Sequence, residues 1–305
     1  MAEGVERGDP RLLAGLGLAV AAMASSGVIV RVADPLPPEL IAAGRVTITA
    51  LAGCLLALTT LPAAARRLAE HPRERAWLVA AGLCLALHFG AWIVSLTMTS
   101  VVRSVALVTT TPIWAGLLAR ALGDRVSPSL YVGGLVALAG TGIMVASEDS
   151  LVGAADGSLA GDALALFGAI TVAVYLAIGR HLHARLGDAL PLRDYFALVN
   201  LIAALGLWGL VGLRGIAIDV PEALAIDWAA VLFLGLVPGV IGHGLLNWAV
   251  RRAPVHTVAL ASLLEPLGAA LLAWLVLGEA VGIREGVGAL VLVSGVAIGL
   301  PRRSI

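Results

Sequence analysis

Residues 77–98 read WLVAAGLCLALHFGAWIVSLTM, and this stretch indicates what kind of fold the chain adopts. It contains no aspartate, glutamate, lysine or arginine. A bilayer core of about 30 Å is crossed by a helix of about 20 apolar residues. We therefore predict that this stretch is a transmembrane helix.

The composition of the whole chain is also that of a membrane protein. Hydrophobic residues make up 60% of the 305 positions, charged residues make up 13%, and the mean hydropathy is +0.98. Because soluble domains carry about 25% charged residues, the composition excludes a soluble domain. The net charge is zero and no run of basic residues occurs, which argues against nucleic acid as a partner.

A search for runs of about 20 apolar residues finds ten candidate spans with short connections between them. We predict an all-α integral membrane protein with ten transmembrane helices, near residues 12–32, 39–61, 77–98, 101–122, 130–147, 161–179, 195–213, 229–250, 257–277 and 283–300.

The arginines, which are all 20 of the basic residues, orient these spans. With the N-terminus in the cytoplasm, 15 of them fall on the cytoplasmic side and four on the opposite side. Such an excess is the positive-inside pattern of multi-pass proteins. We expect a multi-pass protein of a bacterial or archaeal cell (inner) membrane, in contact with the lipid bilayer and with both termini cytoplasmic.

The two halves of the chain share landmarks at a nearly constant offset of 154 or 155 residues. The pairs are His88 with His243, Pro112 with Pro266, Gly133 with Gly288, and Gly140 with Gly295. Since each half holds five spans, the second half enters the membrane with the opposite orientation. We predict two inverted five-helix repeats, residues 11–147 and 160–300, an arrangement typical of secondary transporters.

Several short motifs follow one another along the chain. They are Ser25-Ser26-Gly27, Pro38-Glu39-Leu40 through Arg45, Leu87-His88-Phe89 through Val101, Thr111-Pro112, Leu122-Gly123-Asp124, Leu263-Leu264-Glu265-Pro266 and Leu277-Gly278-Glu279. In order and spacing they resemble the EamA-type branch of the drug/metabolite transporter (DMT) superfamily, over residues 11–300. The resemblance implies two EamA repeats and export of amino acids or related metabolites. Asp124 departs from it, because the family usually has glutamate there.

Polar groups at membrane depth are costly and are therefore candidates for function. Glu265 lies near the middle of the ninth span, directly before Pro266, which is expected to kink the helix. Its carboxyl could bind a substrate amine, carry a coupling proton, or serve as a structural group between the halves. We expect Arg45, in the second span, to be a gating residue or to form an ion pair with Glu265.

The repeat-related His88 and His243 are expected around mid-membrane, where they either flank a cavity or bond to backbone carbonyls. Residues 235–244 hold four glycines and a proline, which indicates an interrupted helix at a substrate site or close helix packing. Asn247 shares the face of His243. We predict a substrate site formed by His88, Trp92, Thr111, Trp114, Tyr175, His243, Asn247, Ser262 and Glu265.

These features predict a secondary transporter with a small-molecule substrate, working by alternating access. Amino acids or related amine-bearing or neutral solutes are expected, in the direction of export. A flippase for an amphipathic lipid-linked substrate is the alternative, and an intramembrane enzyme is less favoured because no G-x-S-x-G or H-E-x-x-H pattern occurs. We expect no cofactor and no metal ion, leave coupling to protons open, and expect a monomer or a homodimer.

Overall fold

The structure is a computed structural model that describes residues 9–33, 35–98, 104, 107–123, 126–145, 159–272, 275 and 283–299. Regular structure in this part of the chain is helical throughout. The first half forms α1 (Pro10–Ala24), α2 (Ser26–Val32), α3 (Pro38–Leu56), α4 (Leu61–Glu70), α5 (Pro72–Met98), α7 (Thr111–Ala121) and α8 (Pro128–Val145). The second half forms α10 (Leu159–Leu186), η2 (Gly187–Ala189), α11 (Leu192–Leu213), α12 (Ala225–Leu234), η3 (Gly235–His243), α13 (Gly244–Val250), α14 (Val255–Ser262), α15 (Glu265–Leu272) and α16 (Ile283–Gly299).

The helices follow the spans predicted from the sequence. α3, α5, α10 with η2, α11 and the continuous run α12–η3–α13 are each long and apolar enough to cross a membrane. Shorter apolar helices occupy four further spans: α1, α8, α14–α15 and α16. Of the fourth span, α7 is described, whereas Asp124 and the motif at residues 277–279 lie outside the described residues.

Proline marks the start of several helices. Pro10, Pro38, Pro72 and Pro128 are each the first residue of their helix, where the missing N–H costs no helical hydrogen bond. At α1 the side chain of Asp9 adds a cap, because its Oδ1 accepts a hydrogen bond from the Arg11 N–H at 2.9 Å. Local sequence therefore sets where these helices begin.

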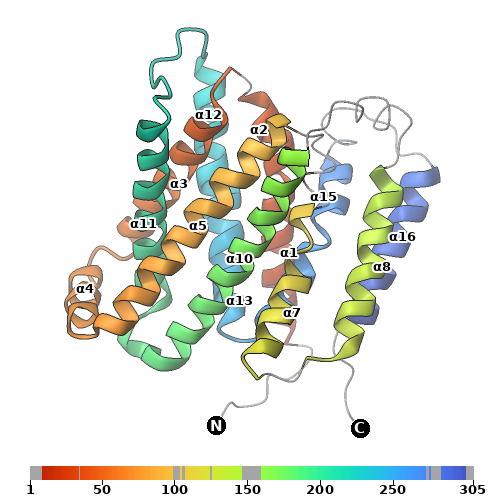
Figure 1. The fold of residues 1–305 in the computed structure, drawn as a ribbon, viewed down its shortest axis with the longest axis horizontal. Helices are drawn as coiled ribbons and strands as arrows, with labels where there is room; N and C mark the ends of the chain where they lie inside the picture. The colour runs from red at the N-terminus through yellow and green to blue at the C-terminus, as the bar shows by residue number, and fades with distance from the viewer. Residues whose placement is uncertain are drawn as a thin grey trace.

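One helix, α4, was not predicted, because residues 62–76 were read as a connection. It buries Ala64 and Leu68 and leaves Arg66 and Arg67 exposed, which is the four-residue spacing of an amphipathic helix. Being only ten residues long, it escapes a search for membrane-length runs. Figure 1 shows α4 at one end of the bundle and the 214–224 connection at the opposite end.

The packing relates the two repeats by an approximate two-fold symmetry. α5 packs on α10. In the inverted arrangement, η3 and α13 are the counterparts of α5 and α1 is the counterpart of α10, and η3 and α13 pack on α1. Three other pairs each join a helix to its own equivalent: α3 with α11, α7 with α14, and α8 with α16. The helices thus form an all-α membrane fold of two inverted repeats, as predicted, with α8 and α16 side by side at one flank (Figure 1).

Glycines bring α8 and α16 into backbone contact. A Cβ atom at Gly133 would collide with backbone atoms of Gly299 and Gly295, and one at Gly140 would collide with those of Leu292 and Gly288. The contacts of Gly133 with Gly295 and of Gly140 with Gly288 are exchanged by the repeat symmetry. Small residues that allow such close approach are a common device of membrane helices.

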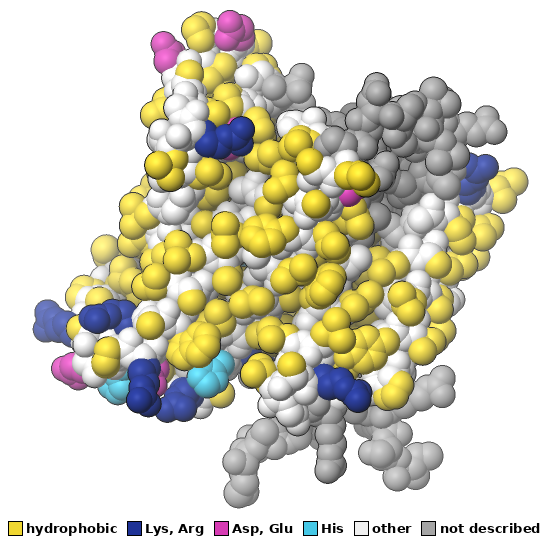
Figure 2. Space-filling view, viewed as in Figure 1, with side chains coloured by type: hydrophobic (Ala, Val, Ile, Leu, Met, Phe, Trp, Pro, Cys, Tyr) yellow, Lys and Arg dark blue, Asp and Glu magenta, His cyan; other side chains and the backbone are white. Residues whose placement is uncertain are grey.

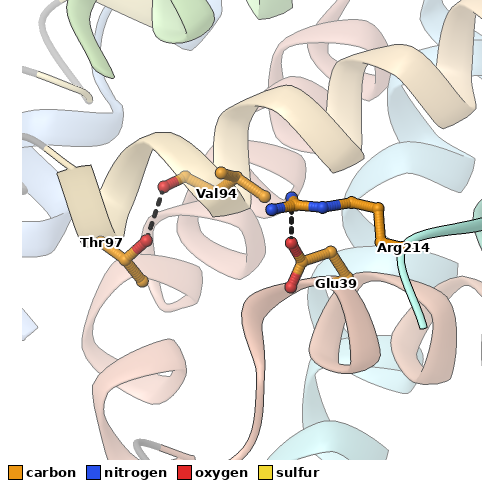
Figure 3. A network of polar contacts seen from close by, with 4 residues as sticks. All are labelled: Glu39, Val94, Thr97 and Arg214. Carbon is orange, nitrogen blue, oxygen red and sulfur yellow. Dashed lines mark hydrogen bonds and ion pairs between the residues drawn. The ribbon is translucent and has the colours of Figure 1, made fainter. Parts of the chain in front are cut away.

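Polar contacts join α3 and α11 at both of their ends. Near the 214–224 connection, Arg214 donates a hydrogen bond to the buried carboxylate of Glu39, beside the Thr97–Val94 turn of α5 (Figure 3). At the other end, the Thr60 hydroxyl donates to Oδ1 of Asp194 at 2.6 Å. The start of α3 is therefore held to the end of α11, and Thr60, in the turn between α3 and α4, is held to the start of α11.

The outer surface of the bundle is apolar along its length. Figure 2 shows hydrophobic side chains covering the visible flank, whereas charged side chains gather mainly toward the two ends. Exposed leucines on this surface include Leu51, Leu83, Leu135, Leu205 and Leu290. A water-soluble monomer rarely exposes so wide an apolar surface, so this surface faces lipid in a multi-pass membrane protein.

Candidate functional site

A cavity lies where helices of the two repeats meet. Its volume of about 60 Å³ holds only a few water molecules, so the helices are drawn closely around it. Both repeats contribute to the lining, which consists of Met23, Ser26, Arg45, His88, Phe89, Trp92, Val108, Thr109, Thr111, Val172, Leu176, His243, Leu246, Ala259, Ser262 and Glu265.

Most of the residues predicted for the site meet in this cavity. Seven of the ten line it: Arg45, His88, Trp92, Thr111, His243, Ser262 and Glu265. The structure adds Phe89, Met23 and several aliphatic side chains that sequence reasoning missed. Phe89 directly follows His88 in the sequence, and this adjacency was the one signal that could have pointed to it.

Three predicted residues do not line the cavity. Trp114 is half-buried on α7 and donates from Nε1 to the Thr110 hydroxyl at 3.1 Å. Tyr175 is fully buried, and its hydroxyl accepts a 2.5 Å hydrogen bond from Asn247. Asn247 also donates to the backbone carbonyl of His243 at 2.8 Å. Tyr175 and Asn247 therefore support the turn that carries His243.

His88 and His243 face each other across the repeat interface. Their ring centroids are 6.4 Å apart, and the His88 ring stacks on Trp92 at 6.2 Å with an interplanar angle of 5°. His88 Nδ1 lies 2.9 Å from the carbonyl oxygen of Gly168. A carbonyl only accepts hydrogen bonds, so Nδ1 carries a proton there, and a neutral His88 ring has its acceptor at Nε2. No group of residues suited to a metal ion occurs in the described ranges.

Arg45 is a buried cation at this cavity. The side chain is 1% exposed, and its guanidinium carbon lies 4.4 Å from the centroid of the Phe89 ring. Nε and Nη1 have no hydrogen-bond partner among the residues that the structure describes. The expected ion pair between Arg45 and Glu265 is absent in this conformation, because Arg45 packs over an aromatic ring instead. A gating role for Arg45 stays a prediction.

Glu265 reaches the cavity from the start of a helix. The ninth span is interrupted at Leu263 and Leu264, and Glu265 begins α15 with Pro266 in its first turn. The sequence predicted a kink at this proline, and the structure has a full interruption just before it. Proline is favoured in the first turn of a helix, so Pro266 starts α15 and thereby sets the position of the carboxyl.

The eighth span contains the most irregular helix of the described chain. Gly235–His243 form a π-helix, η3, with Pro238 inside it. The sequence predicted an interrupted helix; the observed path stays helical but is wound more widely. The Thr49 hydroxyl of α3 donates to the Gly235 carbonyl at 2.8 Å, which stabilises the start of this segment.

The repeat explains where the π-helix comes from. A Cβ at Gly82 would contact Ile202 and the carbonyl of Val199, and one at Gly235 would contact Ile48 and the carbonyl of Arg45. Gly82 and Gly235 are therefore equivalent, at an offset of 153 residues, whereas His88 and His243 are offset by 155. Two additional residues lie between these points in the second repeat. An inserted residue in a helix is absorbed as a wider π turn, which is frequent at functional sites.

The fold and this cavity define an integral membrane protein of two inverted repeats with a polar centre. A sequence model of the EamA-like transporter family matches residues 12–146 and again 159–300. The chain therefore belongs to the EamA-like transporter family, which is a family of transporters and not of enzymes. Its substrate is accordingly a small molecule that crosses the bilayer.

A solved protein crystal structure shares the fold. It is 20% identical in sequence, aligns with a TM-score of 0.74, and covers 95% of this chain and 97% of its own. A sequence identity of 20% shows that the two proteins share a fold and shows nothing about a shared function. No curated protein matches the sequence.

Proposed function

We propose that the protein exports amino acids, or related amine-bearing or neutral solutes, across the cytoplasmic membrane by alternating access. The observation that supports this most directly is the cavity between the repeats, since both repeats line it. Substrate sites of inverted-repeat transporters lie near the bilayer midplane at the repeat interface. Rocking of one repeat against the other would widen the cavity from one side at a time.

The boundaries and orientation belong to the same proposal. Repeats at 11–147 and 160–300, with both termini cytoplasmic, place the arginine-rich connections inside. In this orientation α4 lies at the cytoplasmic end of the bundle and the 214–224 connection lies outside. Glu265, His88 and His243 then stand between the two openings, where a substrate passes them.

Solute counterflow in proteoliposomes tests the proposal. Vesicles that hold purified protein are preloaded with one unlabelled solute and then offered the labelled form. The panel comprises aliphatic amino acids, aromatic amino acids, amines and nucleosides. Wild type is compared with Glu265→Gln and His88→Ala, and with the matched surface variants Glu222→Gln and His71→Ala, whose side chains are exposed away from the cavity.

Saturable exchange of amino acids or amines that is lost in a cavity variant and kept in both surface variants is the expected result. Exchange that survives both cavity substitutions contradicts the site. No exchange of any solute by folded protein contradicts the transport proposal, and movement of a fluorescent lipid analogue in the same vesicles would then favour the flippase.

A further inference from the structure

We propose that the surface around α4 binds anionic phospholipid through a cluster of exposed arginines. The arginine cluster consists of Arg66, Arg67, Arg73, Arg75 and Arg193. It lies outside the central cavity, and the inference does not depend on which solute the protein transports. Its basis is the meeting of these cations with lipid-facing leucines at the end of a membrane-crossing helix.

The helix α4 lies at a surface of the bilayer. It joins the end of α3 to the start of α5, and both of these helices are long and apolar enough to cross a membrane. α4 packs on α5 and on α11. At its end, His71 Nδ1 donates a hydrogen bond to the Arg67 carbonyl at 2.8 Å, since a carbonyl oxygen only accepts. α4 is therefore held against one end of the bundle (Figure 1).

Three helices bring the arginine cluster together. Arg66-Arg67 is exposed on α4, and Arg73 and Arg75 are exposed in the first turn of α5. Arg193 is exposed in the first turn of α11, and its Nε donates a hydrogen bond to the Thr60 hydroxyl at 3.1 Å, beside the start of α4. Figure 2 shows basic side chains gathered at the end of the bundle where Figure 1 places α4.

The arginine cluster carries more charge than its acidic neighbours balance. The acidic residues within 57–76 and 186–194 are Glu70, Glu74, Asp188 and Asp194. Glu74 is already paired with Arg185, which is outside the cluster, at 3.4 Å. The other three carboxylates are outnumbered by the five arginines, and none of the five forms an ion pair among the residues that the structure describes. The surface is therefore positive and attracts an anionic ligand.

The leucines beside the arginine cluster indicate that this ligand is a lipid. Leu51, Leu55, Leu56 and Leu58, in the last turns of α3 and directly after it, are each 64–72% exposed. Trp77, near the start of α5, is about half exposed, as tryptophans at membrane interfaces often are. A phospholipid at this surface would bury its acyl chains on the leucines while its phosphate accepts hydrogen bonds from guanidinium groups. A soluble anion would use the arginines alone.

Lipid binding is measured by thermal unfolding of the purified full-length protein in detergent. The probes are phosphatidylglycerol and phosphatidylcholine with the same acyl chains, and glycerol 3-phosphate, which has the phosphate and no acyl chains. A ligand that binds the folded state raises the unfolding midpoint as its concentration increases. We expect phosphatidylglycerol to act at an about 10-fold lower concentration than phosphatidylcholine, and this preference to shrink as the salt concentration is raised. Glycerol 3-phosphate at the same concentrations should cause no shift.

A pair of double variants locates the binding surface. Arg66→Gln combined with Arg67→Gln should reduce the preference for phosphatidylglycerol by about threefold or more, because two headgroup contacts are lost. The control is Arg251→Gln combined with Arg252→Gln, which removes the same charge from exposed arginines between α13 and α14 and should keep the preference. Each preference is a ratio between two lipids acting on one protein, so a lower basal stability of a variant does not imitate the expected result.

Three outcomes would overturn the inference: equal shifts by the two lipids with wild type, an undiminished preference in the Arg66→Gln/Arg67→Gln variant, or an equal loss in the control, which would indicate a response to net charge alone. A shift by glycerol 3-phosphate as large as that by phosphatidylglycerol would replace the lipid by a soluble anion. If the test variant does not fold, Arg73→Gln combined with Arg75→Gln takes its place. No transported solute takes part, so the result is independent of the counterflow experiment.

Discussion

The guanidinium of Arg45 lies over the ring of Phe89, and not beside a carboxylate. The two residues come from α3 and α5, and Phe89 also meets the His243 ring of η3 at a centroid distance of 5.2 Å. One aromatic side chain thus joins a buried cation to the repeat-related histidines. Nε and Nη1 of Arg45 have no hydrogen-bond partner among the described residues.

Replacing Phe89 with leucine should destabilise the protein and weaken substrate binding. The variant keeps an apolar group but removes the ring face that stabilises the Arg45 charge, with an expected loss of about 1–2 kcal/mol. The unfolding midpoint in detergent measures this. Phe233→Leu, on a partly exposed face of α12, is the control, and equal midpoints for the two variants would contradict the prediction.

The glycine contact between α8 and α16 predicts a sharp difference between two alanine substitutions in one helix. Gly133→Ala places a Cβ against the backbone of α16 and should cost about 1–3 kcal/mol through overpacking. Gly142 has open space around it, so Gly142→Ala should be neutral or stabilising, since alanine favours helix more than glycine does. Unfolding of both variants in detergent is the measurement. A stable Gly133→Ala protein would show that the helices separate easily.

The contact between Glu39 and Arg214 should be measurable as a coupling free energy between the two side chains in protein unfolding. Arg214 is about half exposed, which weakens the ion pair, so we expect a coupling of only about 0.5–1 kcal/mol. A double-mutant cycle with Glu39→Gln and Arg214→Gln measures it by unfolding in detergent. Additive single effects would show that the pair contributes nothing to the tie between α3 and α11.

Substitutions of Tyr175 and Tyr131 form a matched pair that tests the hydrogen bonds of Asn247 to Tyr175 and to the His243 carbonyl. Tyr175→Phe removes the acceptor of a buried Asn247 N–H and should cost about 1–3 kcal/mol. The Tyr131 hydroxyl is buried without a partner in the described chain, so Tyr131→Phe should be neutral or stabilising.

Because Tyr175 does not line the cavity, its substitution should change substrate affinity less than His243→Ala does. The unfolding midpoint reports the effect on stability, and binding of the solutes used for counterflow, measured on the same samples, reports the effect on affinity. A large loss of affinity with unchanged stability in Tyr175→Phe would place this hydroxyl in the binding site after all.

Much of the candidate site could be predicted because polar residues are rare in membrane helices. Arg45, His88, His243 and Glu265 stood out against apolar surroundings, and all four line the cavity. Leu176 and Leu246 could not be found in this way. In a membrane helix the lipid-facing and cavity-facing sides are both apolar, so the periodicity that marks the buried side of a soluble helix is absent.

The repeat was readable from the sequence only in part. Constant offsets between glycines, prolines and histidines indicated two halves, and the packing of α5 on α10 and of η3 on α1 follows that symmetry. The π-helix was not readable, because the equivalence of Gly82 and Gly235 depends on their contacts with Ile202 and Ile48 in space. Sequence spacing alone aligned the histidines and left the two added residues unnoticed.

The sequence by itself determined that the chain is a bundle of membrane helices in two inverted repeats. In lipid the backbone must satisfy its hydrogen bonds within each segment, so apolar runs of sufficient length become helices wherever they occur. The tertiary structure alone decided which side chains meet. Sequence reasoning paired Arg45 with Glu265 by charge, whereas the packing of α3 against α5 and η3 places Arg45 over Phe89, because the direction of each helix face depends on its neighbours.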